Sequence, residues 1–254
     1  MSVNDKSLTG KVALVIGASR NMGRVFAEML GRDGASVAVH YNSPSSAAGA
    51  EETAKAVRLT GAAAETVQAD ITRRADLTGL FDRVEARFGG VDIVINTAGM
   101  MIKKDVMEVT EDDFDRIFAL NAKAAFFVLQ EAARRLRDNG RIVNLGTSLL
   151  AATTGHYAAY AGSKAPLEHF TRALAKEIGA RGITVNTICP GPMDTEFFHA
   201  AETPQTTAFL KSLSINGQLG KVDDLTPLVR MLVSPENTWL TAQSIFINGG
   251  FVAR

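Results

Sequence analysis

The chain has 254 residues, 46% of them apolar, and carries 27 basic and 27 acidic side chains. This length suits one large α/β domain or two small ones, and a balanced charge without a basic run argues against nucleic acids and anionic membranes as partners. Cys189 is the single cysteine, so no internal disulfide forms and a reducing compartment is expected. The polar start, MSVNDKSLTGK, and the lack of a long apolar run predict neither a signal peptide nor a membrane span, so we expect a cytoplasmic protein.

A glycine-rich turn follows the first predicted strand. Residues 11–16 (KVALVI) form the apolar run expected of a strand that is buried on both faces, and apolar residues from Met22 to Leu30 recur at helical spacing. Between them lie Gly17, Ala18, Ser19, Arg20, Asn21, Met22 and Gly23. Backbone N–H groups and the helix dipole at such a turn favour an anion such as a phosphate, although a plain tight turn would explain the pattern as well.

The second predicted strand, residues 36–40, ends in Tyr41, Asn42 and Ser43. In a nucleotide-binding fold this point meets the adenosine ribose, where an acidic residue would bind the 2′-hydroxyl and repel a 2′-phosphate. No acid stands here, and Arg20 can reach the same place from the preceding turn. We therefore expect NADP(H) to be preferred over NAD(H); the alternative is a neutral surface loop.

The rest of the chain continues to alternate strands and helices. Further strands are predicted at residues 65–69, 91–95, 140–145, 183–188 and 244–247, and further helices near 73–88, 111–138, 156–180 and 222–233. Residues 196–218 are predicted to be irregular, as a functional lid or a mobile loop. The alternation predicts the α/β class: a single doubly wound, Rossmann-like domain over residues 1–254, with a seven-stranded parallel sheet, helices on both faces and a substrate loop at about 193–218.

Tyr160 and Lys164 stand four residues apart on a predicted helix, so their side chains share one face. An ammonium one turn away favours the phenolate and is expected to lower the Tyr160 pKa toward the range where tyrosine exchanges protons. A solvated helix face is the simpler alternative. Asn121 lies amid apolar residues of another predicted helix, where Asn is disfavoured unless its amide is used, for chemistry or to cap a kink. Pro166 predicts a local distortion of the Tyr160 helix.

Taken together and in this order, the motifs resemble those of the short-chain dehydrogenase/reductase family over essentially the whole chain. They are the glycine turn, Asn96-x-Ala-Gly, Asn121, Tyr160-x-x-x-Lys164 and Pro190-Gly191. Two residues of the turn depart from the family pattern: Ile16 replaces a threonine and Asn21 replaces the middle glycine. Because Asn tolerates a left-handed backbone better than other non-glycine residues, we expect Asn21 to adopt a glycine-like conformation.

The resemblance implies an oxidoreductase that interconverts a carbonyl and an alcohol with NAD(P). In that reading Tyr160 donates a proton to the carbonyl oxygen, Lys164 lowers the tyrosine pKa and binds the nicotinamide ribose, and Asn121 orders a water in the proton relay. A hydroxyl then steadies the substrate oxygen. The usual interval of thirteen residues before Tyr160 favours Thr147, whereas residue type favours Ser148; we expect Thr147.

The resemblance further implies that Asp70 lies at the adenine and residues 190–195 lie beside the nicotinamide. Apart from Tyr160 and Lys164, the residues expected to hold the cofactor follow the carboxyl ends of the predicted strands. They are Gly17, Ser19, Arg20, Asn21, Met22, Gly23, Tyr41, Asn42, Ser43, Asp70, Ile71, Asn96, Ala98, Gly99, Tyr160, Lys164, Pro190, Gly191, Met193 and Thr195. No metal is expected.

The expected substrate wall is largely apolar, with one titratable group. It comprises Met100, Met101, Leu149, His156, Met193, Phe197 and Phe198. This composition favours a hydrophobic ketone or aldehyde, unless these side chains are ordinary core. A 3-oxoacyl thioester reductase and a non-catalytic NADP-sensing regulator are the alternative functions, although a sensor would not need Tyr160, Lys164 and Asn121. The resemblance also implies a homotetramer.

Overall fold

The computed structural model describes residues 6–253, which form one parallel sheet of seven strands in the order β3-β2-β1-β4-β5-β6-β7. The strands are β1 (Val12–Ile16), β2 (Ser36–Tyr41), β3 (Ala64–Gln68), β4 (Val91–Asn96), β5 (Leu136–Leu145), β6 (Thr184–Pro190) and β7 (Ser244–Ile247). The predicted doubly wound α/β sheet is confirmed. The strand order reverses between β1 and β4, the point where such sheets bind ligands.

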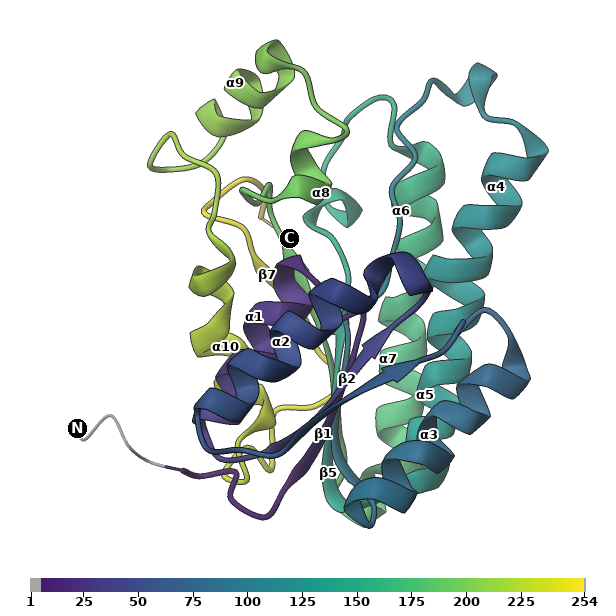
Figure 1. Ribbon diagram of the computed structural model, residues 1–254. Coiled ribbons are helices and arrows are strands. Elements are labelled where there is room, and N and C mark those ends of the chain that lie inside the picture. Colours follow the sequence, from purple (N-terminus) through teal and green to yellow (C-terminus); the bar gives the residue numbers. More distant parts are fainter. Residues whose placement is uncertain (1–5, 254) are drawn as a thin grey trace.

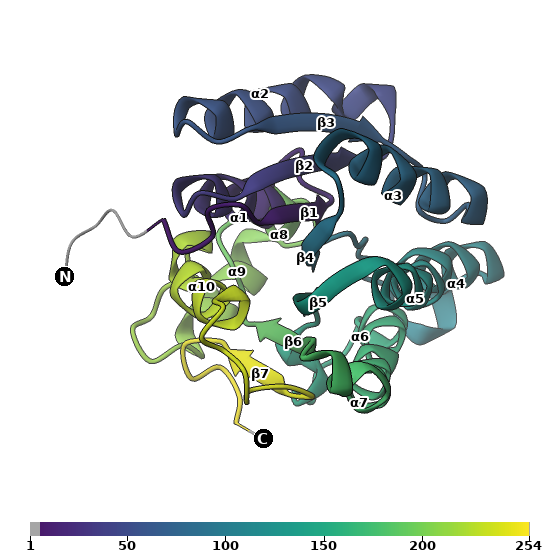
Figure 2. The same cartoon turned by 90° about the horizontal axis from the view of Figure 1, so that it is seen from below.

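Two helix layers cover the sheet (Figures 1 and 2). One face carries α1 (Asn21–Arg32), α2 (Ala47–Leu59) and α10 (Thr226–Val233), and the other carries α3 (Arg74–Phe88), α5 (Ala125–Arg135) and α7 (Pro166–Ile178). Alternate residues of β1 serve the two cores: Val15 packs with Phe26 on one side, and Leu14 packs with Phe81 on the other. Burial on both faces explains the unbroken apolar run of β1. Within residues 6–253, none of the helices combines the length and apolarity needed to cross a membrane.

The helix expected over residues 111–138 is interrupted. The structure has α4 (Glu111–Phe118), a π-helical turn η3 (Ala119–Ala124) and α5, and the chain then enters β5 at Leu136. The expectation of one continuous helix was therefore wrong. The π turn contains Asn121, and such turns are rare and frequently lie at functional sites.

The helix that carries Tyr160 is also divided. It begins at Ala158 rather than near residue 156, and it is formed by α6 (Ala158–Lys164) followed by α7. The break falls at Ala165, directly before Pro166, whose ring lacks the backbone donor of a continuous helix. Ala165 keeps helical dihedral angles (φ −56°, ψ −39°), so Pro166 interrupts the hydrogen bonding of the helix without the expected distortion of its backbone.

The segment expected to be irregular, residues 196–218, contains two short helices, α8 (Glu196–His199) and α9 (Pro204–Ser212). The expectation was wrong because the ends of these helices are set by local caps rather than by a long apolar period. The Thr195 hydroxyl accepts a hydrogen bond from Phe198 N at 3.2 Å, and the Thr203 hydroxyl accepts one from Thr206 N at 3.2 Å. Both helices lie beyond the carboxyl ends of the strands, at the top of Figure 1.

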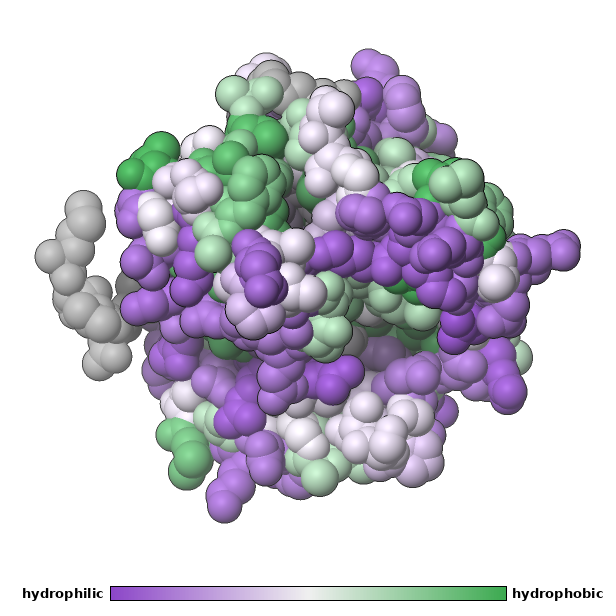
Figure 3. Space-filling view, turned by 90° about the horizontal axis from the view of Figure 1, so that it is seen from above, coloured by the Kyte–Doolittle hydropathy of each residue, from purple (hydrophilic) through white to green (hydrophobic). Residues whose placement is uncertain are grey.

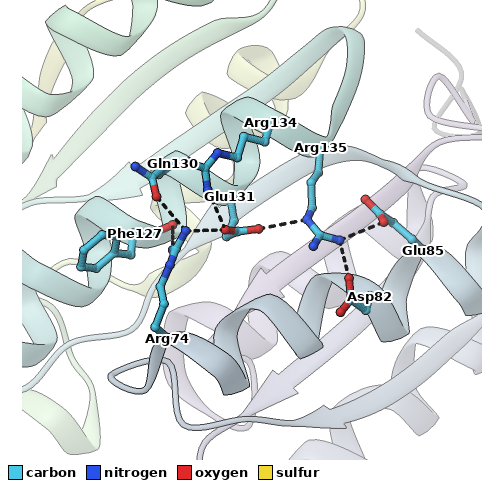
Figure 4. Close-up of polar contacts among 8 residues, drawn as sticks. All are labelled: Arg74, Asp82, Glu85, Phe127, Gln130, Glu131, Arg134 and Arg135. Atoms are coloured by element: carbon cyan, nitrogen blue, oxygen red, sulfur yellow. Dashed lines mark hydrogen bonds and ion pairs between the residues drawn. The ribbon is translucent and has the colours of Figure 1, made fainter.

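A buried carboxylate ties two helices of one layer together (Figure 4). The Glu131 side chain on α5 accepts hydrogen bonds from Arg74 Nη2 of α3 at 2.5 Å and from Arg135 Nε at 2.9 Å. Arg135 also donates to Asp82 of α3 at 2.6 Å. Because a buried charge is tolerated only when it is paired, this network fixes α3 against α5 on their face of the sheet.

Candidate active site

The carboxyl ends of the strands open into a cavity of about 610 Å³. Figure 3 looks onto this end of the molecule, where hydrophobic side chains (green) gather in several patches among hydrophilic ones (purple). Most of the residues expected to hold the cofactor line the cavity: Gly17, Ser19, Arg20, Asn21, Met22, Gly23, Tyr41, Asn42, Asp70, Ile71, Ala98, Gly99, Tyr160, Lys164, Pro190, Gly191, Met193 and Thr195. Ser43 and Asn96 are outside its lining. The Ser43 hydroxyl bonds Ser45, and the Asn96 amide oxygen accepts from Ala98 N at 3.3 Å.

The turn between β1 and α1 has the backbone that an anion site needs. Asn21 has φ 49°, which confirms the expected left-handed conformation at the position of the missing glycine. A Cβ on Gly23 would lie 2.3 Å from Gly17 O and 2.7 Å from Thr97 Oγ1, so only glycine allows this close packing. α1 begins at Asn21 among residues that line the cavity, and the first N–H groups of a helix, which have no partner within it, suit a phosphate.

His40, at the end of β2, supports the same turn and was missed by sequence analysis. Gly17 N donates to His40 Nδ1 at 3.1 Å, and His40 Nε2 lies 2.9 Å from Ala69 O. Because a carbonyl only accepts, Nε2 carries the proton and the ring is neutral. Burial lowers the His40 pKa to about 4. A histidine inside a buried strand leaves no spacing signal, so only the structure reveals this link between the ends of β1, β2 and β3.

Asn121 uses its amide fully. Its Nδ2 donates to Met100 O at 2.8 Å and to Ser163 Oγ at 2.9 Å, while its Oδ1 accepts from Met100 N at 2.9 Å. A Cβ on Gly99 would lie 3.0 Å from Lys164 Nζ and 3.2 Å from Asn121 Oδ1, so the bare glycine lets both groups approach the backbone there. The side chain therefore joins the π turn to the loop after β4 and to α6.

Tyr160 and Lys164 are both buried, with 8% and 4% of their surfaces exposed. Burial raises the pKa of Tyr160 to about 12, against a hydrogen bond with Thr147 that lowers it. Burial lowers the pKa of Lys164 to about 8, and Lys164 Nζ donates to Leu145 O at 2.8 Å. The expected lowering of the tyrosine pKa was therefore wrong, because desolvation outweighs the hydrogen bond with Thr147. A phenol with this pKa keeps its proton at neutral pH and has one to donate.

The two candidate hydroxyls after β5 point in different directions. The Thr147 hydroxyl makes the hydrogen bond with Tyr160 and also accepts from Leu149 N at 3.3 Å. The Ser148 hydroxyl donates to Cys189 O at 2.8 Å and thereby links the ends of β5 and β6. Of the two, Thr147 is placed beside the phenol.

All residues of the expected substrate wall except His156 line the cavity. The cavity lining includes Met100, Met101, Leu149, Met193, Phe197 and Phe198. His156 was wrongly included: its side chain is 57% exposed, its Nδ1 lies 2.6 Å from Asp105 Oδ1, and its backbone has φ 67°. His156 is not among the residues that line the cavity. Tyr157, Glu202, Leu210 and Phe251 line the cavity and were not predicted.

Comparisons with known proteins match nearly the whole chain. A family model described as Enoyl-(Acyl carrier protein) reductase matches residues 17–252. Hydroxynaphthalene reductase-like protein Arp2 of Metarhizium brunneum is 40% identical over 261 residues, which cover 97% of each sequence.

Solved structures agree with this assignment. A protein of Burkholderia cenocepacia, solved with bound NADP, is 49% identical with a TM-score of 0.94, over 97% of this chain and 95% of that one. The angucycline C-6 ketoreductase LanV, also with bound NADP, is 37% identical with a TM-score of 0.90, over 96% of each chain. The resemblance seen in the sequence is confirmed: the chain belongs to the short-chain dehydrogenase/reductase family and is an oxidoreductase.

Proposed function

We propose that the protein interconverts a hydrophobic ketone or aldehyde and its alcohol with NADP(H), using Tyr160 as the acid and base. The observation that carries this proposal is the buried, protonated phenol of Tyr160, hydrogen-bonded to Thr147 in the cavity that the glycine turn also lines. The printed names of the relatives, a hydroxynaphthalene reductase-like protein and a ketoreductase with NADP, support the same class of reaction.

The residues fit the cofactor that the family implies. The phosphates would lie against the N–H groups of the turn at Asn21, and the nicotinamide end would reach Tyr160 and Lys164. The bound nicotinamide supplies the hydride that reduces the carbonyl carbon. The Thr147 hydroxyl donates a hydrogen bond to the carbonyl oxygen, and Tyr160 O–H gives it the proton as negative charge develops there.

After that step the tyrosine must recover its proton. Lys164, with its pKa lowered to about 8, is a suitable donor on this side of the cavity. Asn121 hydrogen-bonds both the loop at Met100 and Ser163 of α6. It thereby fixes the position of α6, the helix that carries Tyr160 and Lys164. In the reverse direction the tyrosinate takes the proton from the alcohol.

The end of β2 favours NADP(H) over NAD(H). Tyr41, Asn42 and Arg20 line the cavity there, and the nearby Asp70 carboxylate is already used, accepting from Thr72 N at 3.0 Å and Thr72 Oγ1 at 2.6 Å. A guanidinium without an opposing acid suits a 2′-phosphate. The ratio of kcat/KM with NADPH and with NADH measures the preference, and a higher value with NADH would refute it.

A carbonyl panel tests the proposed reaction. Ketones, aldehydes, quinones and acyl thioesters are offered with NADPH, and loss of NADPH absorbance is followed. Turnover of apolar ketones or aldehydes is the expected result. Turnover of 3-oxoacyl thioesters alone would favour the alternative function, a 3-oxoacyl thioester reductase. The description of the matching family model, which names an acyl-carrier substrate, also suggests this alternative. Tight NADPH binding with no turnover of any carbonyl would favour a regulator.

We further propose that the chain works as a single cofactor-binding domain over residues 1–254, with a substrate segment at 193–218, in the cytoplasm and as a homotetramer. Exposed apolar side chains support an assembly: Phe126 is 43% exposed and Trp239 is 94% exposed. Light scattering on the purified protein measures the mass, and a monomer would refute this part.

A further inference from the structure

Three polar side chains from distant segments meet beside the substrate wall. Lys103 Nζ lies 2.5 Å from Glu202 Oε2, and the Tyr157 hydroxyl donates to Glu202 Oε1. Only 1% of the Glu202 side chain is exposed. Burial would raise the Glu202 pKa, but hydrogen bonds from Lys103, Thr206 and Tyr157 lower it overall, so the carboxylate stays ionised. We call Lys103, Tyr157 and Glu202 the Glu202 cluster.

The cluster joins three segments that border the cavity. Lys103 belongs to the loop after β4, and Tyr157 directly precedes α6, the helix that carries Tyr160. Glu202 lies between α8 and α9, which together form what we call the α8–α9 segment, residues 196–212. Because a buried charge is stable only beside its partners, the carboxylate ties this segment to the catalytic helix.

Apart from this cluster, the α8–α9 segment is loosely packed. The structure describes all nine residues of α9; none of them is buried, and Phe209 is 61% exposed. On α8, Phe198 is buried, and just beyond α9 the Ile215 N–H donates to Gly249 O at 2.8 Å. A segment that buries little apolar surface separates locally from the rest of a protein at a low cost in free energy. The bonds of Glu202 therefore decide much of that cost.

The segment covers one end of the cavity. Both of its helices lie beyond the carboxyl ends of the strands (Figure 1), and Phe197, Phe198 and Leu210 line the cavity. A ligand at this end is enclosed between the segment and the helix of Tyr160, so its passage requires the segment to move. Both carboxylate oxygens of Glu202 are bonded within the protein, so Glu202 acts on the segment and not on the ligand.

We propose that the Glu202 cluster is a latch: it sets how often the α8–α9 segment opens, and thereby how fast ligands enter and leave the nicotinamide end of the cavity. Glu202 is in this role a positioning residue. The inference rests on the proposed function in that the cavity takes NADP(H), but it concerns exchange of the ligand rather than the reaction. Because the bonds of the latch lie within the protein, their loss favours opening equally with and without ligand. Both rate constants then rise by one factor, and the dissociation constant stays the same.

The kinetics of NADPH binding test this directly. Stopped-flow fluorescence gives the association and dissociation rate constants of the wild type and of Lys103→Met, a residue that does not line the cavity. Loss of a hydrogen bond to a charged group shifts an equilibrium by about tenfold to a hundredfold. Both rate constants should therefore rise by about that factor in the variant, while the dissociation constant stays within about twofold.

A double variant tests whether the two charges act as one unit. Glu202→Met alone should raise both rate constants as Lys103→Met does, since each leaves a charge without its partner. Replacing a buried ion pair by two apolar side chains is often neutral, so the combined variant should bring the rate constants back toward the wild type. Effects that simply multiply in the combined variant would show that the two residues act separately, which overturns the latch.

Hydrogen exchange locates the opening. In Lys103→Met the amides of the α8–α9 segment should exchange about tenfold to a hundredfold faster, whereas those of β1 and β4 should keep their wild-type rates, since the opening is local. A purely structural role would instead lower protection in the central strands as well and weaken NADPH binding.

The matched control is Lys104→Met. Lys104 is the next residue, pairs with Asp113 at 2.5 Å and does not line the cavity, so the rate constants and the exchange should stay as in the wild type. Unchanged rate constants in Lys103→Met, or faster dissociation without faster association, overturn the inference even if ketones are reduced. The expected change of both rate constants in a protein that reduces no carbonyl would leave the latch standing and refute the proposed function.

Discussion

The two ends of the cavity are built in different ways. At the cofactor end the decisive features are backbone features: Asn21 has a left-handed φ of 49°, Gly23 admits a contact that no side chain allows, and His40 holds Gly17 N and Ala69 O. At the substrate end the wall is made of side chains from the loop after β4, α8 and α9. Positions that serve the backbone require particular residue types, whereas positions that fill space accept many. Asn21 and Gly23 were read from the sequence because the turn restricts their residue types, whereas His40 and Tyr157 were missed because no motif marks them.

The largest effect is expected where the two ends meet. Tyr160→Phe should lower kcat by about a thousandfold, because only the transition state uses the phenolic proton. The NADPH dissociation constant should change by less than about twofold, since the cofactor end is intact. Stopped-flow turnover and fluorescence titration measure the two quantities.

Lys164→Ala is the comparison variant for Tyr160→Phe. It should weaken both turnover and NADPH binding, since the lysine would serve the tyrosine and the ribose. A Tyr160→Phe enzyme with nearly normal kcat would sink the proposed mechanism.

The next effect separates the two hydroxyls after β5. Thr147→Val should lower kcat by about tenfold to a thousandfold, as the loss of an oxyanion donor does. Ser148→Ala should leave kcat nearly unchanged and cost about 1 kcal/mol of stability, because its hydroxyl serves Cys189 O. Turnover and thermal unfolding of both variants check this. The opposite pattern, with Ser148→Ala inactive and Thr147→Val active, would assign the role to Ser148.

His40 gives the cofactor end a pH-dependent stability. The unfolded chain protonates this histidine with an ordinary pKa of about 6.5, whereas the folded protein does so near pH 4. Between these values the unfolded state binds more protons, so the stabilisation is complete above pH 6.5 and is lost as pH falls through 4. The loss amounts to about 3 kcal/mol.

Urea unfolding between pH 4 and pH 7 measures the His40 contribution. His40→Asn should remove this step, and it should weaken NADPH binding because Gly17 N loses its partner. His169, exposed on α7, provides the control: His169→Asn should retain the step. An unchanged pH profile in His40→Asn would show that another group causes it.

The same division explains what sequence analysis could predict. The central strands were predicted because burial on both faces makes β1 wholly apolar and β4 largely so, and Asn21 was predicted because its turn tolerates few residue types. Glu202 was missed because its partners Lys103 and Tyr157 lie about a hundred residues and forty-five residues away in the sequence. Sequence periodicity does not reveal contacts between residues so far apart. The direction of the Tyr160 pKa was wrong for a similar reason, since residue spacing does not reveal burial.

The smallest expected effect tests whether the cofactor end depends on backbone alone. Glycine adopts a positive φ without a steric cost, so Asn21→Gly should leave the NADPH dissociation constant within about twofold and stability within about 1 kcal/mol. Asn21→Val should cost about 2 kcal/mol and weaken NADPH binding, because a left-handed backbone is costly for a side chain branched at Cβ. Glu28→Val, inside the same helix, measures the ordinary cost of valine in α1 plus the loss of the Glu28 ion pairs with Arg24 and Arg32, about 1 kcal/mol together. If Asn21→Val costs no more than Glu28→Val, the left-handed backbone of Asn21 does not govern the turn, and its side chain must be considered instead.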